Sequence, residues 1–194
     1  MILEALGPMS RNPEPLRLAS VPDPSPGPGE VLVRVVTSGV CHTELDEIEG
    51  RTPPPSLPVI LGHQVVGQIE GMGPGAERFV VGDRVGVAWI FDACHGCHHC
   101  LAGNENLCSK FRATGRDANG GYAELLVVPE DFAFPIPQVF TDAEAAPLLC
   151  AGAIGYRSFN LTNLEDGQPL GLTGFGASGH LVLKMVRHTC PASE

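Results

Sequence analysis

The chain has 194 residues and a formal net charge of −10 at pH 7, from 12 basic and 22 acidic side chains. An acidic chain repels phosphate backbones, so a nucleic-acid-binding protein is disfavoured, and only two lysines are present to attract a membrane surface. No stretch has the roughly twenty apolar residues of a membrane-spanning helix, and the N-terminus lacks the features of a signal peptide. We therefore expect a cytoplasmic protein with reduced thiols that binds neither nucleic acid nor a membrane.

The first 140 residues have the composition of a β-rich domain, with glycine and proline separating short apolar runs. One or two short strands are expected before residue 20, and a valine-rich strand is expected over Glu30–Ser38. A short helix should begin near Cys41. Further strands are predicted over 65–70, from a turn at Gly82 to Trp89, and over 122–128, with proline-rich loops at 21–29 and 51–58. Short strands at this spacing indicate a β-barrel or a sandwich.

The composition changes near residue 141. Residues 142–160 are alanine-rich and predict helix, with Pro147 in the first turn of a second helix. A short buried strand is expected over 168–173, followed by glycines at 174, 176 and 179 and a helix over 181–187. Strand, glycine turn and helix occur here in the order that a dinucleotide-binding site requires.

Four of the seven cysteines follow a C-x2-C-x2-C-x7-C spacing, at Cys94, Cys97, Cys100 and Cys108. Such gaps let a tight loop turn its sulfurs toward one point, as in a closed structural zinc site. Two disulfides are an alternative that a reducing compartment disfavours. An iron–sulfur cluster is the main rival, and a histidine at 95, 98 or 99 could replace one cysteine as ligand.

Three more potential metal ligands, Cys41, His63 and Cys150, are far apart in the sequence. Each alone is a weak signal, since a lone cysteine is more often a small buried apolar residue and a lone histidine is often a core residue.

Seven stretches, in order from near residue 30 to about 188, make the chain resemble the zinc-dependent medium-chain alcohol dehydrogenases, near their cinnamyl-alcohol-type members. They are GVCHT at 39–43, LGH at 61–63, GDRVGV at 82–87, the cysteine loop, GGYAE at 120–124, APLLCAG at 146–152 and GLTGFGASGH at 171–180. The resemblance implies a mainly β, GroES-like catalytic domain over 1–150 and the first part of an α/β Rossmann NAD(P)-binding domain over 151–194.

The resemblance also implies the roles of individual residues. Cys41, His63 and Cys150 would hold a catalytic zinc beside the structural zinc of the cysteine loop, which makes two ions per chain. Thr43 is similar to the hydroxyl that relays the alcohol proton, and His42 to a residue near the cofactor pyrophosphate. Glu44 would orient His63, and Trp89 would shape the substrate pocket. The glycines Gly174, Gly176 and Gly179 would let the backbone approach the pyrophosphate of NAD or NADP. Hydride transfer between a primary alcohol or aldehyde and the nicotinamide is the implied reaction.

The chain departs from the family at three points. Gln64 stands where a glutamate usually follows the metal histidine, and Asp46 stands where the family often has a proton-relaying histidine. The chain is also about half the family length, so we interpret it as truncated and expect little turnover from it alone. The incomplete second domain exposes apolar segments at 170–173 and 181–186, for which a homo-oligomer is expected. The alternative is a non-catalytic zinc-binding fragment or assembly module.

Overall fold

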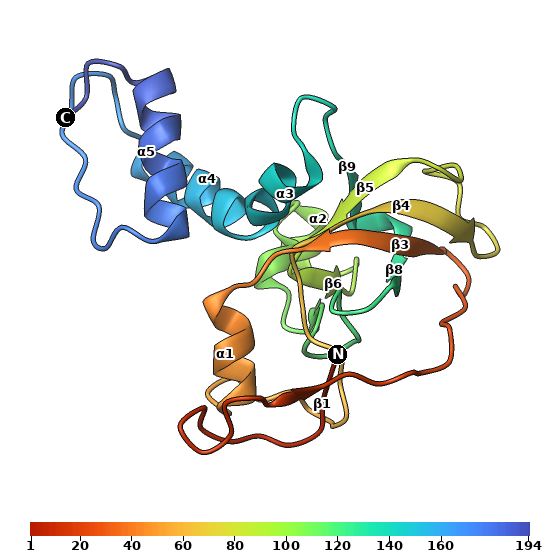
Figure 1. The fold of residues 1–194 in the computed structure, drawn as a ribbon. Coiled ribbons are helices and arrows are strands. Elements are labelled where there is room, and N and C mark those ends of the chain that lie inside the picture. Colours follow the sequence, from red (N-terminus) through yellow and green to blue (C-terminus); the bar gives the residue numbers. More distant parts are fainter. The chain divides into compact units, whose positions relative to one another are not determined.

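The computed structural model describes all 194 residues, which divide into two compact units, Met1–Ala146 and Pro147–Glu194 (Figure 1). The first unit is mainly β and the second is built from two helices. None of the helices is both long and apolar enough to cross a membrane.

A five-stranded antiparallel sheet is the body of the first unit, in the order β8-β3-β4-β5-β9. Its strands are β3 (Glu30–Ser38), β4 (Val65–Met72), β5 (Arg84–Val87), β8 (Leu125–Pro129) and β9 (Ala133–Pro135). β3 lies between β8 and β4, with Val33 opposite Ile69 of β4 and Leu126 of β8. Val31 and Val33 are fully buried, because alternate side chains of a strand point to the same face. These valines begin the main hydrophobic core, which also takes in residues of the cysteine loop.

Shorter elements flank the sheet. β1 (Ile2–Leu3) pairs with β2 (Leu16–Arg17), and β6 (Ile90–Asp92) pairs with β7 (Arg112–Ala113). The helix α1 (His42–Ile48) follows β3 directly, and Ile48 at its end packs with Leu3, Val59 and Leu61 in a second apolar cluster. The remaining helical turns of this unit are α2 (His98–Leu101), η1 (Glu105–Leu107), η2 (Glu130–Phe132) and α3 (Asp142–Ala145).

The second unit contains α4 (Ala151–Thr162) and α5 (Ala177–Thr189), and the 3-10 turn η3 (Ala146–Leu149) connects it to the first. Gly155 of α4 lies so close to Val182 of α5 that a Cβ there would stand 2.9 Å from the valine side chain. Val182, Val186 and Cys190 are buried together in this helix pair. Phe159, Leu164 and Leu170 pack against this small apolar cluster.

Most of the predicted elements are confirmed, including the mainly β character, the strand at Glu30–Ser38 and the helix after Cys41. β8 begins three residues later than predicted, and β6, β7 and β9 were not predicted. The strand predicted over 168–173 is wrong: these residues form no strand and most are exposed. A strand is held by hydrogen bonds to neighbouring strands, and this unit contains no other strand to pair with.

Candidate metal centres

The four cysteines of the loop converge on one point, with all four sulfurs within 4.8 Å of one another. Cys97 Sγ lies 3.5 Å and Cys94 Sγ lies 3.9 Å from Cys100 Sγ. Four thiolates bound at about 2.3 Å to one tetrahedral zinc ion stand about 3.8 Å apart, so the spacing of the sulfurs suits such an ion. Disulfide-bonded sulfurs would lie about 2.05 Å apart, and none of the seven cysteines forms a disulfide.

The surroundings of the loop cysteines shift the pKa of two of their thiols. Backbone N–H groups of Gly96 and Cys97, with neighbouring thiols, lower the pKa of Cys94 to about 6. Burial and the other thiols raise the pKa of Cys100 to about 12, because sulfurs this close cannot all be ionised without a counter-charge. The Lys110 N–H donates a hydrogen bond to Cys108 Sγ over 3.3 Å.

The three histidines of the loop lie outside this group of ligand atoms. His98 and His99 stack on each other with ring centroids 3.8 Å apart, and His95 faces Asp92 at 3.6 Å. The geometry therefore favours an all-cysteine site over one with a histidine ligand.

Within the first unit, Cys41 and His63 form the second candidate centre. Cys41 precedes α1, His63 precedes β4, and Cys41 Sγ lies within 4.8 Å of a ring nitrogen of His63. Glu44 of α1 contacts both residues: one carboxylate oxygen accepts a 2.7 Å hydrogen bond from the Cys41 N–H, and the other lies 2.6 Å from His63 Nδ1. The second contact has the distance of an ion pair without the alignment of a hydrogen bond. Glu44 thus contacts both the loop and the ring, and that it orients His63 stays a prediction.

His63 is 1% exposed, and neither of its ring nitrogens makes a hydrogen bond. Burial disfavours its charged form, but Cys41 and Glu44 outweigh this effect and raise the pKa of His63 to about 9. The Trp89 ring packs edge-on against the imidazole, with centroids 5.1 Å apart. A buried imidazole with an unpartnered nitrogen beside a thiol has the donor chemistry that zinc takes, so these residues fit the ion.

The neighbours of Cys41 on α1 have different environments. The Cys41 thiol donates to the Thr43 hydroxyl over 3.5 Å. His42 is exposed, and its Nε2 lies 3.6 Å from Asp46, which also pairs with Arg51 at 2.5 Å. Asp46 is therefore held by charge pairs on the outer side of the helix.

Gln64, the other departure from the family pattern, is buried beside His63. Its amide oxygen lies against Gly39, where an added Cβ would stand only 2.2 Å away. The amide thus fills the space between two segments that carry Cys41 and His63.

The remaining predicted residues belong to the second unit. Cys150 is the residue before α4, and Gly176 is the residue before α5. Gly174 has φ +81°, which favours glycine, and Gly179 approaches the Gly174 carbonyl so closely that a Cβ would stand 2.9 Å from it. The glycine turn and the helix are therefore present without the strand expected before them.

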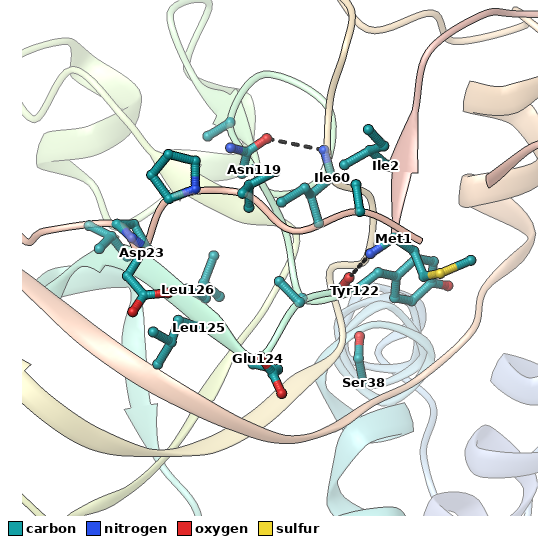
Figure 2. Close-up of a pocket in the computed structure, with 18 of the residues that line it drawn as sticks. Met1, Ile2, Asp23, Ser38, Ile60, Asn119, Tyr122, Glu124, Leu125 and Leu126 are labelled. Atoms are coloured by element: carbon teal, nitrogen blue, oxygen red, sulfur yellow. Dashed lines mark hydrogen bonds between the residues drawn. The ribbon is translucent and has the colours of Figure 1, made fainter. Parts of the chain in front are cut away.

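A cavity of about 980 Å³ lies in another part of the first unit (Figure 2). The residues that line it include Met1, Ile2 and members of the segments 18–24 and 118–127. The Met1 ammonium donates to the Tyr122 carbonyl over 2.6 Å, and the Ile60 N–H donates to Asn119 over 3.1 Å. None of the candidate ligands lines it, and its walls are mostly apolar with no converging set of ionisable groups. We assign no chemistry to it.

One buried ionisable residue near His63 was missed by the sequence analysis. Glu47 of α1 is fully buried, and neither of its carboxyl oxygens makes a hydrogen bond. The motif that identifies Cys41 and Glu44 ends before this position, and nothing in the local spacing singles it out.

Comparisons with known proteins agree with this architecture. Residues 27–138 match the family described as the alcohol dehydrogenase GroES-like domain. The chain is 46% identical over 185 residues to the probable alcohol dehydrogenase AdhA of Mycobacterium tuberculosis (strain CDC 1551 / Oshkosh), covering 92% of this chain and 53% of that relative. It is 40% identical over 175 residues to an alcohol dehydrogenase of Geobacillus stearothermophilus, covering 90% and 52%. The chain thus spans about half the length of the curated relatives it matches.

Two solved structures are similar in fold. A cinnamyl alcohol dehydrogenase of Sorghum bicolor superposes with a TM-score of 0.86 at 32% identity, over 99% of this chain and 56% of that one. A cobalt- and zinc-bound thermostable alcohol dehydrogenase of Pyrobaculum aerophilum superposes with a TM-score of 0.89 at 28% identity, over 100% and 56%.

Proposed function

The chain belongs to the alcohol dehydrogenase GroES-like domain family, and from this membership we propose that it carries the metal-binding part of a zinc-dependent alcohol dehydrogenase. The observation that carries the proposal is the buried His63 imidazole beside the Cys41 thiol, with Glu44 fixing both. Cys150 is proposed as the third ligand. The four loop cysteines are proposed to hold a second zinc ion, which supports the fold, rather than an iron–sulfur cluster, because a similar structure is described as zinc-bound.

The proposed reaction removes a proton and a hydride from a primary alcohol and leaves an aldehyde, while NAD or NADP accepts the hydride. Bound zinc supplies a Lewis acid that makes the alcohol proton more acidic. Glu44 would keep the His63 imidazole oriented, Thr43 beside Cys41 would relay the alcohol proton to solvent, and Trp89 would close one side of the site with an apolar ring. His42, at the exposed start of α1, is proposed to face the cofactor phosphates.

The cofactor site is proposed only in part. Gly174, Gly176 and the N-terminus of α5 can approach a pyrophosphate, but one glycine turn and one helix do not enclose a dinucleotide. We therefore propose residues 147–194 as the beginning of a Rossmann domain, and we assign alcohol oxidation to a protein of the full family length. A reducing cytoplasm and a homo-oligomer, which would cover exposed apolar side chains such as Phe175, belong to the same proposal.

Metal analysis of the purified 194-residue chain tests the metal centres. We expect two zinc ions per chain, a loss of one in Cys150→Ser and a loss of the other in Cys97→Ser. One ion per chain, unaffected by Cys150→Ser, would refute the catalytic site and favour the non-catalytic zinc-binding module, for which Gln64 and Asp46 are the supporting residues. With benzyl or cinnamyl alcohol and NAD(P)⁺ we expect little turnover from these residues alone; rapid turnover would show that the longer protein is not needed.

A further inference from the structure

The helix α1 buries two carboxyl groups in a helix of seven residues. Glu44 and Glu47 are 2% and 0% exposed, and they are three residues apart, so they lie on the same face. Glu44 has partners in Cys41 and His63, but neither oxygen of Glu47 makes a hydrogen bond. A buried carboxyl group without a partner costs free energy of folding, whether it is charged or neutral.

None of the neighbouring charged side chains forms a salt bridge with Glu47. Burial, and then the charge of Glu44, raise the pKa of Glu47 to about 8, while His63 and Arg116 act in the opposite direction. The Arg116 guanidinium, which acts on Glu47 electrostatically, lies 2.7 Å from Asp117 and stands over the Trp89 ring. A glutamine of the same size carries no ionisable group and would avoid the part of this cost that ionisation adds, so folding stability gives no reason for a glutamate here.

A divalent cation bound between Cys41 and His63 would be attracted by the negative charge of an ionised Glu47 carboxylate. The residue beside His63 is the neutral Gln64, so it adds no negative charge to the site. Glu47 acts electrostatically on both His63 and Glu44, and a positive ion at the imidazole would favour its ionised form.

We propose that Glu47 is a positioning residue of the Cys41–His63 centre, whose buried negative charge, acting through Glu44 and His63, increases the affinity of this centre for a divalent metal ion. The proposal rests on the function proposed above. It makes a specific prediction: Glu47 lowers the stability of the metal-free protein and raises its metal affinity. A purely structural glutamate would stabilise the metal-free protein and leave its metal affinity unchanged.

Cobalt titration of the metal-stripped 194-residue chain tests the proposal, since two thiolates and an imidazole give Co²⁺ a different absorption spectrum from four thiolates. The band that disappears in Cys41→Ser identifies the Cys41–His63 centre. In Glu47→Gln we expect the Co²⁺ affinity of this band to fall roughly 10- to 100-fold, with the four-cysteine band unchanged. The matched control is Glu70→Gln, which removes one negative charge from an exposed pair with Arg34 and should titrate like the wild type.

Thermal unfolding of the metal-free variants completes the test. Glu47→Gln should melt at or above the wild-type temperature, and Glu47→Asp, which keeps the charge, should retain most of the Co²⁺ affinity. Unchanged Co²⁺ affinity in Glu47→Gln overturns the inference. It is also overturned if metal-free Glu47→Gln melts below the wild-type temperature and Glu47→Asp loses as much Co²⁺ affinity as Glu47→Gln. If the wild-type chain has no Cys41-dependent band at all, the proposed function itself is wrong, which is a different outcome.

Discussion

Replacing Glu47 by glutamine should change how the stability of the metal-free chain depends on pH. Burial and the charge of Glu44 raise the pKa of Glu47 from 4.5 to about 8 in the folded state. Between these two values the folded chain keeps a proton that the unfolded chain has lost, so the wild-type free energy of unfolding falls as the pH rises. The loss is about 1.4 kcal/mol per pH unit inside this window, for a domain whose total stability is typically about 5–15 kcal/mol.

Urea unfolding of the metal-stripped wild type and Glu47→Gln, followed by circular dichroism between about pH 5 and about pH 8, measures this effect. The stability advantage of Glu47→Gln should be small at the acid end and should grow steadily toward about pH 8. The other groups that face Glu47 are Glu44, His63, Arg116 and Asp117, and the substitution leaves all of them in place. Glu70→Gln provides the comparison for an exposed carboxylate. A difference that stays constant across the pH range would refute the reasoning.

Three further outcomes are expected. Cys97→Ser should release one metal ion per chain and lower the melting temperature, because it removes one of four converging sulfurs; unchanged metal content would contradict the site. Gly120→Ala should destabilise the first unit by about 1–3 kcal/mol, since its Cβ would stand 2.1 Å from the Gly62 carbonyl oxygen, whereas Gly7→Ala, with nothing within 4 Å, should be nearly neutral in the same urea titration. Leu126→Ala should cost about 2–5 kcal/mol by leaving a cavity beside β3, and a cost below 1 kcal/mol would show that the core is looser than described.

The sequence predicts those parts of the fold whose structure depends on local pattern. Val31, Val33 and Val35 alternate with a period of two and lie in the strand β3, and the proline-rich stretch at 51–58 contains no helix or strand. The glycine turn at 174–179 leads into a helix because glycine permits the positive φ of Gly174. The residues at 168–173 fail as a strand because a strand depends on partners outside its own sequence, and the second unit has none.

The four loop cysteines are predictable for a related reason, since a loop that binds one ion places its ligands at restricted spacings, whereas Cys41, His63 and Cys150 are predicted only through the resemblance to the family motifs. A residue that acts on a metal through space has no such spacing. Glu49 is two positions beyond Glu47 on the same segment, yet its carboxylate accepts a 3.0 Å hydrogen bond from the Met9 N–H and pairs with Arg51. Two glutamates that look equivalent in the sequence thus differ completely in partners. Only the burial of α1 against the apolar cluster around Leu61 separates them, and that burial depends on packing between distant segments.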